Sequence, residues 1–366
     1  MHVALTWCYP RRKTKMAAKR EKVFVAISGG VDSSTAAASL IEAGFDCTGI
    51  FMITNNQFQT AQANARQVAE RLGITLHVMD LRPDFEQILD YFCSEYKKGR
   101  TPNPCVVCNK YIKFDKLWDF ARENGADLLA TGHYARILTN NGTTGLYDGA
   151  DAAKDQSYAL AMINKEILPF LVLPVGGHSK DHTRRLAARF TLGTEHKTES
   201  QEICFIPDNN YISLIEQRCP ELARSGKIID TEGRVIGEHN GVHRYTIGQR
   251  RGLSLAMGKP YYVAKIDAKM NTVTLGPKEK VMHRKLSASS VNWLTEEPPS
   301  VFRAIVKIRY NDKAAPALVV VQDNSVVVEF DEPNLAITPG QLAVFYIRQE
   351  IGNKVLGGAW IDKAYN

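Results

Sequence analysis

The sequence has no apolar run as long as the roughly 18 residues of a transmembrane helix, so no membrane partner is expected. It has neither a recognisable secretory signal nor the regularly spaced cysteine pairs of a disulfide framework. Its seven cysteines are irregularly spaced, which favours reduced thiols in a cytosol, and we expect a cytoplasmic protein. The net charge is +7, from 46 basic and 39 acidic residues. This modest excess permits a polyanionic partner without requiring one.

The length and composition indicate an ordinary globular protein of more than one domain. The chain has 366 residues, 44% of them hydrophobic and 23% charged, which is enough to bury a sizeable core. Its N-terminal end differs, because six Lys and Arg residues precede the first acid, Glu21. We expect residues 1–21 to form a basic disordered tail, with either Met1 or Met16 as the true start. An organelle transit peptide is the alternative.

The stretch Ser28–Ser34, Ser-Gly-Gly-Val-Asp-Ser-Ser, lies between an apolar run and a run of good helix formers. A buried strand, a glycine turn and a helix start favour a phosphate-binding loop, because the glycines let the backbone approach an anion and the helix N-terminus attracts it. Asp32 offers a carboxylate to a Mg²⁺ ion that bridges the phosphates. No Lys follows the glycines, which excludes the Walker type of loop. The simpler alternative is a capped strand–turn–helix connection.

Strand-like and helical segments alternate up to about residue 210. This alternation predicts an α/β fold, a doubly wound parallel sheet of the PP-loop type, over residues 22–210. Ligands of such sheets bind beyond the carboxyl ends of the strands. We therefore expect a nucleotide site that is formed by Ala26, Ile27, Ser28, Gly29, Gly30, Val31, Asp32, Ser33, Met52 and Gly132.

The pattern changes at about Tyr211, where short segments and glycines replace the long helices. Residues 211–281, which include a basic string at 243–252, are predicted to form a small central domain that contacts a polyanion. Residues 282–366 are strand-like throughout, with a predicted hairpin turn at 322–325. They predict a C-terminal antiparallel β-barrel.

Two segments carry cysteines in a distinctive setting. Cys105 and Cys108 form a CxxC after a loop with two prolines, Pro102 and Pro104, and Cys204 lies between Ile203 and Phe205. Half of a zinc site is one explanation of the CxxC, but no second CxxC or HxxxH follows it, and no metal site is predicted. On its two apolar neighbours alone, Cys204 would be a buried structural thiol.

The loop at 28–34 resembles that of the ATP pyrophosphatases, the PP-loop superfamily, which split ATP into AMP and pyrophosphate to activate an oxygen. Taken together, the motifs of the chain resemble those of the tRNA-specific 2-thiouridylases. The resemblance runs in the family's order from about Val23 to about Ile361. The matching motifs are GRTPNPxxxCNxxIKF at 99–114, ATGHY at 130–134, KDQSY at 154–158, ICFI at 203–206 and TPGQ at 338–341.

The resemblance implies an enzyme, a tRNA-uridine 2-sulfurtransferase that uses ATP and Mg²⁺. The 2-carbonyl oxygen of the wobble uridine would be adenylated, and a persulfide would then attack the activated carbon, with release of AMP and pyrophosphate. Cys204 would carry the persulfide, Cys108 would be a second catalytic thiol able to form a disulfide with it, and Asp32 would serve the adenylation. The implied partners are the tRNA anticodon stem-loop and a cysteine desulfurase or sulfur-relay protein. The implied contacts with tRNA are Asn103, Pro104, Cys105, His133, Lys154, Asp155, Gln156, Arg309, Tyr310 and Gln341.

Two departures from the family pattern leave alternatives open. The segment 51–59 is short where members often carry an insertion, and some members have Asp at the position of Cys105. Three thiolates, Cys105, Cys108 and Cys204, are the minimum for an iron–sulfur cluster with one open iron, so such a cluster is an alternative to the persulfide. An amidating PP-loop ligase for a small metabolite would leave the cysteines unused. An RNA- or metal-binding module would be expected to have lost Asp32 or Cys204.

Overall fold

The computed structural model describes residues 20–55, 58–140, 142–195, 203–206, 210–253, 260–296 and 298–366. Most of the predicted basic tail, residues 1–19, lies outside these ranges. The chain divides into two compact units. The first comprises Met1–Phe85, Cys108–Glu199 and Ile347–Leu356, and the second Glu86–Val107, Ser200–Tyr346 and Gly357–Asn366. The domain boundaries expected after residues 21, 210 and 281 stay predictions. Within the described ranges, every helix is too short or too polar to cross a membrane.

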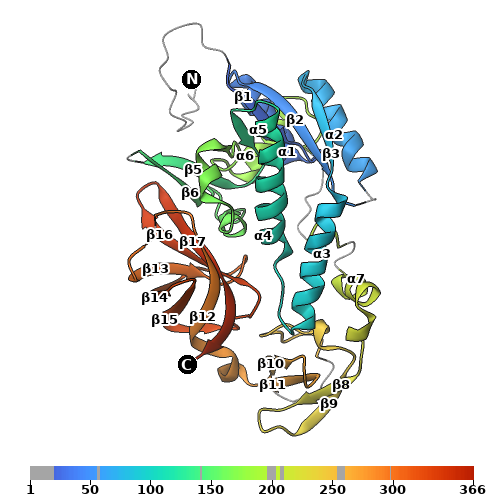
Figure 1. The fold of residues 1–366 in the computed structure, drawn as a ribbon, viewed down its shortest axis with the longest axis vertical. Helices are drawn as coiled ribbons and strands as arrows, with labels where there is room; N and C mark the ends of the chain where they lie inside the picture. The colour runs from blue at the N-terminus through green and yellow to red at the C-terminus, as the bar shows by residue number, and fades with distance from the viewer. Residues whose placement is uncertain are drawn as a thin grey trace. The chain divides into compact units, whose positions relative to one another are not determined.

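The first unit contains a five-stranded sheet in the order β3-β2-β1-β4-β7 (Figure 1). Neighbouring strands are parallel throughout, as the alternation of strands and helices requires. Its strands are β1 Lys22–Ala26, β2 Asp46–Ile53, β3 Leu76–Asp80, β4 Leu128–Ala130 and β7 Leu171–Val172. Its helices are α1 Val31–Glu42, α2 Gln59–Leu72, α5 Leu117–Glu123 and α6 Lys180–Arg189. The predicted parallel α/β sheet is confirmed.

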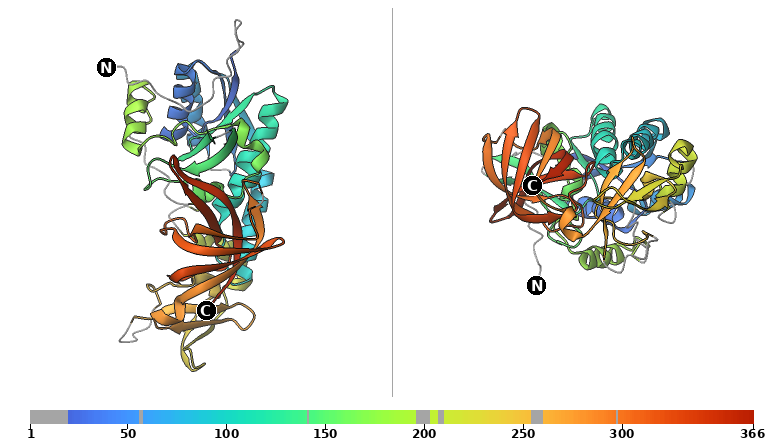
Figure 2. Two further views of the ribbon diagram at one scale, coloured as in Figure 1. Left: turned by 90° about the vertical axis from the view of Figure 1, so that its left-hand side faces the viewer. Right: turned by 90° about the horizontal axis from the view of Figure 1, so that it is seen from below.

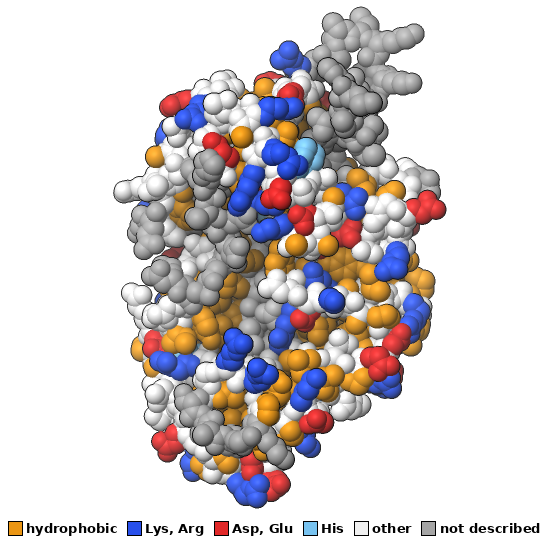
Figure 3. All heavy atoms as spheres, turned by 180° about the vertical axis from the view of Figure 1, so that it is seen from behind, with side chains coloured by type: hydrophobic (Ala, Val, Ile, Leu, Met, Phe, Trp, Pro, Cys, Tyr) orange, Lys and Arg blue, Asp and Glu red, His pale blue; other side chains and the backbone are white. Residues whose placement is uncertain are grey.

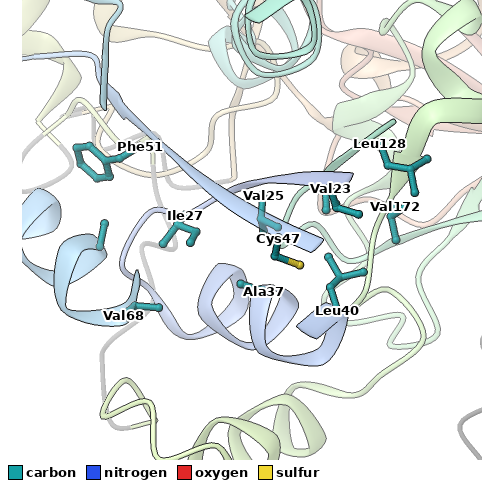
Figure 4. Close-up of a cluster of buried hydrophobic side chains, with 12 residues drawn as sticks. Val23, Val25, Ile27, Ala37, Leu40, Cys47, Phe51, Val68, Leu128 and Val172 are labelled. Carbon is teal, nitrogen blue, oxygen red and sulfur yellow. The ribbon is translucent and has the colours of Figure 1, made fainter. Parts of the chain in front are cut away.

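Strand β1 is central, and both of its faces are covered. On one face, Val23, Val25 and Ile27 belong to a buried cluster with side chains from α1, α2 and β2 (Figure 4). On the other face, the ring of Phe24 lies 6.3 Å from that of Phe120 in α5. Because successive side chains of a strand point to opposite faces, this alternation fixes β1 between two helical layers. Its carboxyl end, where the glycine loop begins, is thereby held rigidly.

The second unit contains most of a six-stranded β-barrel (Figures 1 and 2). The strand order β12-β15-β14-β13-β16-β17 is closed by pairing between β12 and β17, which is antiparallel. Alternate side chains fill the interior: Val326, Val328 and Phe330 are buried, whereas Glu329 between them is exposed. The predicted C-terminal antiparallel barrel is confirmed. Its strands are β12 Met282–Trp293, β13 Val301–Lys307, β14 Ala315–Gln322, β15 Ser325–Leu335, β16 Leu342–Gln349 and β17 Gly352–Tyr365.

A small sheet in the order β10-β11-β8-β9 precedes the barrel, with a core of its own around Ile228, Val263 and Val273. Its strands are β8 Gly226–Ile229, β9 Val235–His239, β10 Tyr262–Asp267 and β11 Thr272–Gly276. Helix α7 Tyr211–Arg218 precedes this sheet in sequence, and helix α3 Arg82–Lys97 follows β3. Short 3₁₀ helices are η2 Ser157–Leu160, η3 Lys165–Phe170, η5 Pro220–Leu222, η6 Val242–Arg244 and η7 Lys278–Val281.

Two features were not predicted. A hairpin of β5 Ala135–Asn140 and β6 Thr143–Asp148 follows the fourth strand of the parallel sheet, and it pairs with the tip of β17 through Tyr147 and Lys354. The CxxC segment begins as α4, Pro104–Cys108, and continues as a π-helix, η1 Asn109–Lys116, before α5. Extended π-helices are rare and occur often at functional sites.

Candidate active site

The glycine loop joins β1 to α1 at residues 27–30. Gly29 has a φ of +78°, and a Cβ atom built there would lie 2.8 Å from the Cβ of Asn64 and 2.9 Å from the carbonyl oxygen of Ala61. Gly30 is the N-cap residue of α1 and has extended backbone angles. Only glycine fits the first position, both for its backbone angle and for the space around it. The sequence therefore shapes a tight turn at the N-terminus of a helix.

The serine hydroxyls of the loop have different surroundings. The side chains of Ser28 and Ser33 lie 3.0 Å apart, and Ser28 is exposed. Ser34 is fully buried, and its hydroxyl donates to the carbonyl oxygen of Gly30 at 2.7 Å. The Ser28 hydroxyl is therefore the accessible one, whereas the hydroxyls of the buried Ser33 and Ser34 both donate to the Gly30 carbonyl oxygen and stabilise the first turn of the helix.

A second segment closes on the loop from β4. A Cβ atom at Gly132 would lie 2.6 Å from the backbone nitrogen of Ser33, so residue 132 touches the start of α1. Met52 lies near the carboxyl end of β2, which pairs with β1 in parallel register. The structure thus gathers the predicted nucleotide-site residues of three adjacent strands at one edge of the sheet, as open α/β sheets do around their ligands.

Asp32 is the charged residue of the loop, and it has two partners that the sequence did not reveal. The Nζ atom of Lys180, the first residue of α6, lies 2.7 and 2.8 Å from its two carboxylate oxygens. The hydroxyl of Tyr134 donates to the same carboxylate at 2.8 Å. The Asp32 side chain is still 31% exposed, so a ligand can reach it. The motif containing Tyr134 was visible in the sequence, whereas nothing marked Lys180 except its place after the N-cap residue Ser179.

The CxxC segment is preceded by a loop, residues 99–103, which the turn at 338–341 holds in place. The side-chain amide of Gln341 donates to the carbonyl oxygens of Thr101 and Pro102, both at 3.0 Å. Gly340 has a φ of +89°, and a Cβ atom there would lie 2.7 Å from the Thr101 oxygen. Gln341, expected to contact tRNA, therefore positions the loop that leads to Asn103 and Pro104.

The three candidate thiols differ in exposure. Cys105 is exposed and Cys108 is buried, one helical turn apart in α4. Cys204 is also exposed, although it lies between the partly buried Ile203 and Phe205. Ile206 donates its backbone N–H to the Ile203 oxygen at 2.9 Å and packs into a cluster around Phe92. The alternative of a buried structural thiol is therefore wrong for Cys204.

Several predicted tRNA contacts have partners within the protein. His133 is buried, its Nδ1 lies 2.7 Å from the hydroxyl oxygen of Thr131, and burial holds its pKa well below the usual value. The Asp155 carboxylate accepts from the backbone of Gly149 and from Ser157, at 2.9–3.0 Å. Gln156 accepts from the backbone N–H of Tyr134 at 2.9 Å, and Lys154 is half-buried. These side chains shape their loops, and their contacts with tRNA stay predictions.

The guanidinium of Arg309 points into the protein. It donates to the carbonyl oxygens of Ile247 and Ala336, at 2.9 and 2.7 Å, and to the hydroxyl of Thr338. The neighbouring Tyr310 is 39% exposed, so this aromatic ring is the accessible member of the pair. On the face shown in Figure 3, Lys and Arg side chains lie among acidic and apolar ones, as the modest net charge implies.

No group of three or more His, Cys, Asp or Glu residues in the described ranges is arranged to hold a metal ion. Within the loop sequence, residues 28–34, Asp32 is the acidic residue. One carboxylate together with substrate phosphates is a common environment for Mg²⁺. The loop thus fits a Mg²⁺ ion that arrives with a triphosphate.

Three family models match consecutive parts of the chain. They are described as a tRNA methyl transferase HUP domain at residues 21–208, a tRNA methyl transferase PRC-barrel domain at 213–277 and an aminomethyltransferase β-barrel domain at 283–361. Together they match most of the chain. Their descriptions speak of methyl transfer, whereas the similar proteins below carry a different name.

Similar proteins match the chain along nearly its whole length. The tRNA-specific 2-thiouridylase MnmA of Carboxydothermus hydrogenoformans is 45% identical over 362 residues, which covers 94% of this chain and 98% of that protein. The protein of the same name from Geotalea uraniireducens is 43% identical over 366 residues, with 95% and 96% covered. Among solved structures, the U34-tRNA thiolase NcsA from Methanococcus maripaludis with its 4Fe-4S cluster is 19% identical, with a TM-score of 0.34, over 57% of this chain and 68% of that chain.

Proposed function

The chain belongs to the tRNA-specific 2-thiouridylase family, and on that basis we propose that it replaces the 2-carbonyl oxygen of a tRNA wobble uridine by sulfur at the expense of ATP. The enzyme would be a tRNA-uridine 2-sulfurtransferase, and the anticodon stem-loop its substrate. The wobble base lies in a single-stranded loop, so its extrusion into a site costs little.

The observation that carries the proposal is the exposed thiol of Cys204 on a turn whose other residues pack against the cluster around Phe92. A sulfur carrier must meet a donor protein and then the substrate, and a thiol buried in a core can do neither. Phe205 contributes to the anchoring, because its ring lies 5.6 Å from that of Phe92 in an edge-to-face arrangement. The turn therefore presents the sulfur while its neighbours hold the backbone.

The activation step uses the glycine loop. The 2-carbonyl oxygen attacks the α-phosphorus of ATP, pyrophosphate leaves, and the oxygen becomes part of an AMP leaving group. The backbone N–H groups at the start of α1 and the hydroxyl of Ser28 would bind the phosphates. Asp32 would hold Mg²⁺, which neutralises the charge that develops on them.

The transfer step uses two thiols. The terminal sulfur of a Cys204 persulfide attacks C2 of the base, and AMP leaves. The Cys108 thiolate then attacks the sulfur of Cys204, which releases the thiocarbonyl and leaves a disulfide between the two cysteines. A cellular thiol or a reductase must reduce this disulfide before the next cycle. The donor that recharges Cys204 would be a cysteine desulfurase or a sulfur-relay protein.

Pyrophosphate release and nucleoside analysis test this function directly. We expect the purified protein to release pyrophosphate from ATP when unmodified tRNA is present, and to form thiolated uridine when a persulfide donor is added. Release that depends on a small metabolite would support an amidating ligase instead. No release under any condition would support a binding module. A methylated nucleoside in the digested tRNA would support the activity that the domain descriptions name.

The Cys105→Ala variant separates the persulfide route from an iron–sulfur route. We expect it to keep thiolation activity within about tenfold of the wild type, because the variant loses one contact near the base. We also expect it to contain no iron. The reason is that the proposed persulfide route uses the thiols of Cys204 and Cys108 and needs no third thiol. The measurement is thiolation by protein purified anaerobically, with iron quantified beside it.

Cys108→Ala serves as the matched control, because it removes the other thiol of the same helical turn. It should abolish thiolation by either route. A visible charge-transfer band and stoichiometric iron in the wild type, both lost together with activity in Cys105→Ala, would establish the cluster and overturn the persulfide route.

A further inference from the structure

Lys180 is a buried lysine next to the glycine loop. Its side chain is 9% exposed, and its ammonium group lies within 2.8 Å of both carboxylate oxygens of Asp32, which is 148 residues away in sequence. Lysine is almost never buried unless it is paired, so this position needs the carboxylate. The pair lies where α6 begins and where the first turn of α1 begins.

The surroundings hold the ammonium group at this point. The backbone N–H of Lys180 donates to the Asp151 carboxylate at 3.1 Å, and the aromatic ring of Tyr134 lies 5.6 Å from Nζ. Helices α1 and α6 pack together through Val31 and Ala187, among others. The cation is therefore presented to the loop by a rigid element and is not carried on a mobile surface chain.

The glycine loop contains no lysine of its own, although many phosphate loops use one to bind the phosphates of a nucleotide. Lys180 provides that charge from a distant part of the chain. In the structure as it stands, the ammonium group neutralises Asp32. When a Mg²⁺ ion takes the carboxylate, the buried ammonium needs a new anionic partner within reach, and a phosphate oxygen is such a partner.

We propose that Lys180 is a phosphate-binding residue of the nucleotide site, which exchanges Asp32 for a phosphate oxygen when ATP and Mg²⁺ bind. This inference rests on the proposed use of ATP and adds a residue to that site. Asp32 and Lys180 would then share one role. They form an ion pair with each other until Mg²⁺ binds the carboxylate and a phosphate oxygen binds the ammonium group.

Binding of inorganic pyrophosphate and of adenosine to the full-length protein tests the inference without turnover. Lys180→Met, which keeps the length of the side chain but not its charge, should weaken pyrophosphate binding in calorimetry by about 10- to 100-fold, the range of one hydrogen bond to a charged group. Adenosine binding should stay unchanged. Lys180→Arg should recover part of the pyrophosphate affinity. Lys165→Met, at an exposed position of the same unit, is the control and should bind as the wild type does.

Two outcomes would overturn the inference. Equal pyrophosphate affinity in Lys180→Met and the wild type would show that the ion pair with Asp32 is purely structural. A parallel loss of pyrophosphate and adenosine binding in Lys180→Met would show the same. The double variant Asp32→Asn/Lys180→Met removes both charges of the pair, so its thermal unfolding shows whether an unpaired carboxylate destabilises the single variant. A wild type that binds neither ATP nor pyrophosphate would instead refute the proposed function.

Discussion

An Asp32→Asn variant is expected to release pyrophosphate from ATP about 10²- to 10³-fold more slowly than the wild type. The substitution keeps the size of the side chain and an oxygen that can accept from the Tyr134 hydroxyl. It removes the negative charge that would hold Mg²⁺ against the phosphates, where charge develops during adenylation. Asparagine is preferable to alanine, because alanine would leave the buried ammonium group of Lys180 facing a cavity.

The measurement is pyrophosphate formation with saturating unmodified tRNA, at several Mg²⁺ concentrations. Binding of tRNA should be unchanged, since the loop is proposed to contact the nucleotide. The matched control is Glu70→Gln, the same chemical change at an exposed position of α2 in the same unit. Undiminished pyrophosphate release by Asp32→Asn would show that the nucleotide site is elsewhere.

The glycine loop could be predicted because its determinants are local. A strand, two glycines and a helix start follow one another within a few residues, and the observed φ of Gly29 agrees with what that pattern requires. Lys180 could not be predicted, because its partner is 148 residues away and no spacing rule connects them. The β5–β6 hairpin has a local sequence signal, the dipeptide Asn141-Gly142, which is typical of tight hairpin turns.

Arg309 shows that the alternation of a strand does not fix where a long side chain ends. The alternation of β13 places Arg303 and Lys307 on one face, and continuing it would add Arg309 to that face. The strand ends at Lys307, yet burial still alternates beyond it, because Ile308 is buried like Val306. Arg309 instead turns toward backbone carbonyl oxygens. Similarly, apolar neighbours do not bury Cys204, because it lies in a turn, where adjacent side chains can point in different directions.

A Cys204→Ser variant is expected to lose thiolation of tRNA completely while it still releases pyrophosphate in the presence of tRNA. A hydroxyl cannot carry the sulfane sulfur, whereas the glycine loop and Asp32 are untouched by the change. Because the Cys204 side chain is exposed, serine at this position should leave the anchoring cluster intact and the thermal unfolding unchanged. The measurement is mass spectrometry of nucleosides from treated tRNA, with a persulfide donor in excess.

Cys219→Ala provides the matched control, because Cys219 is buried in the same cluster that anchors the turn. This variant loses a sulfur atom near the site but not the proposed carrier, so it should still thiolate tRNA, with at most a modest loss of stability. Labelling with a persulfide-specific reagent after incubation with the donor should mark the wild type and Cys219→Ala but not Cys204→Ser. Thiolation by Cys204→Ser, or its loss in Cys219→Ala with the fold intact, would place the sulfur carrier on another cysteine and would leave the exposed turn without its proposed role.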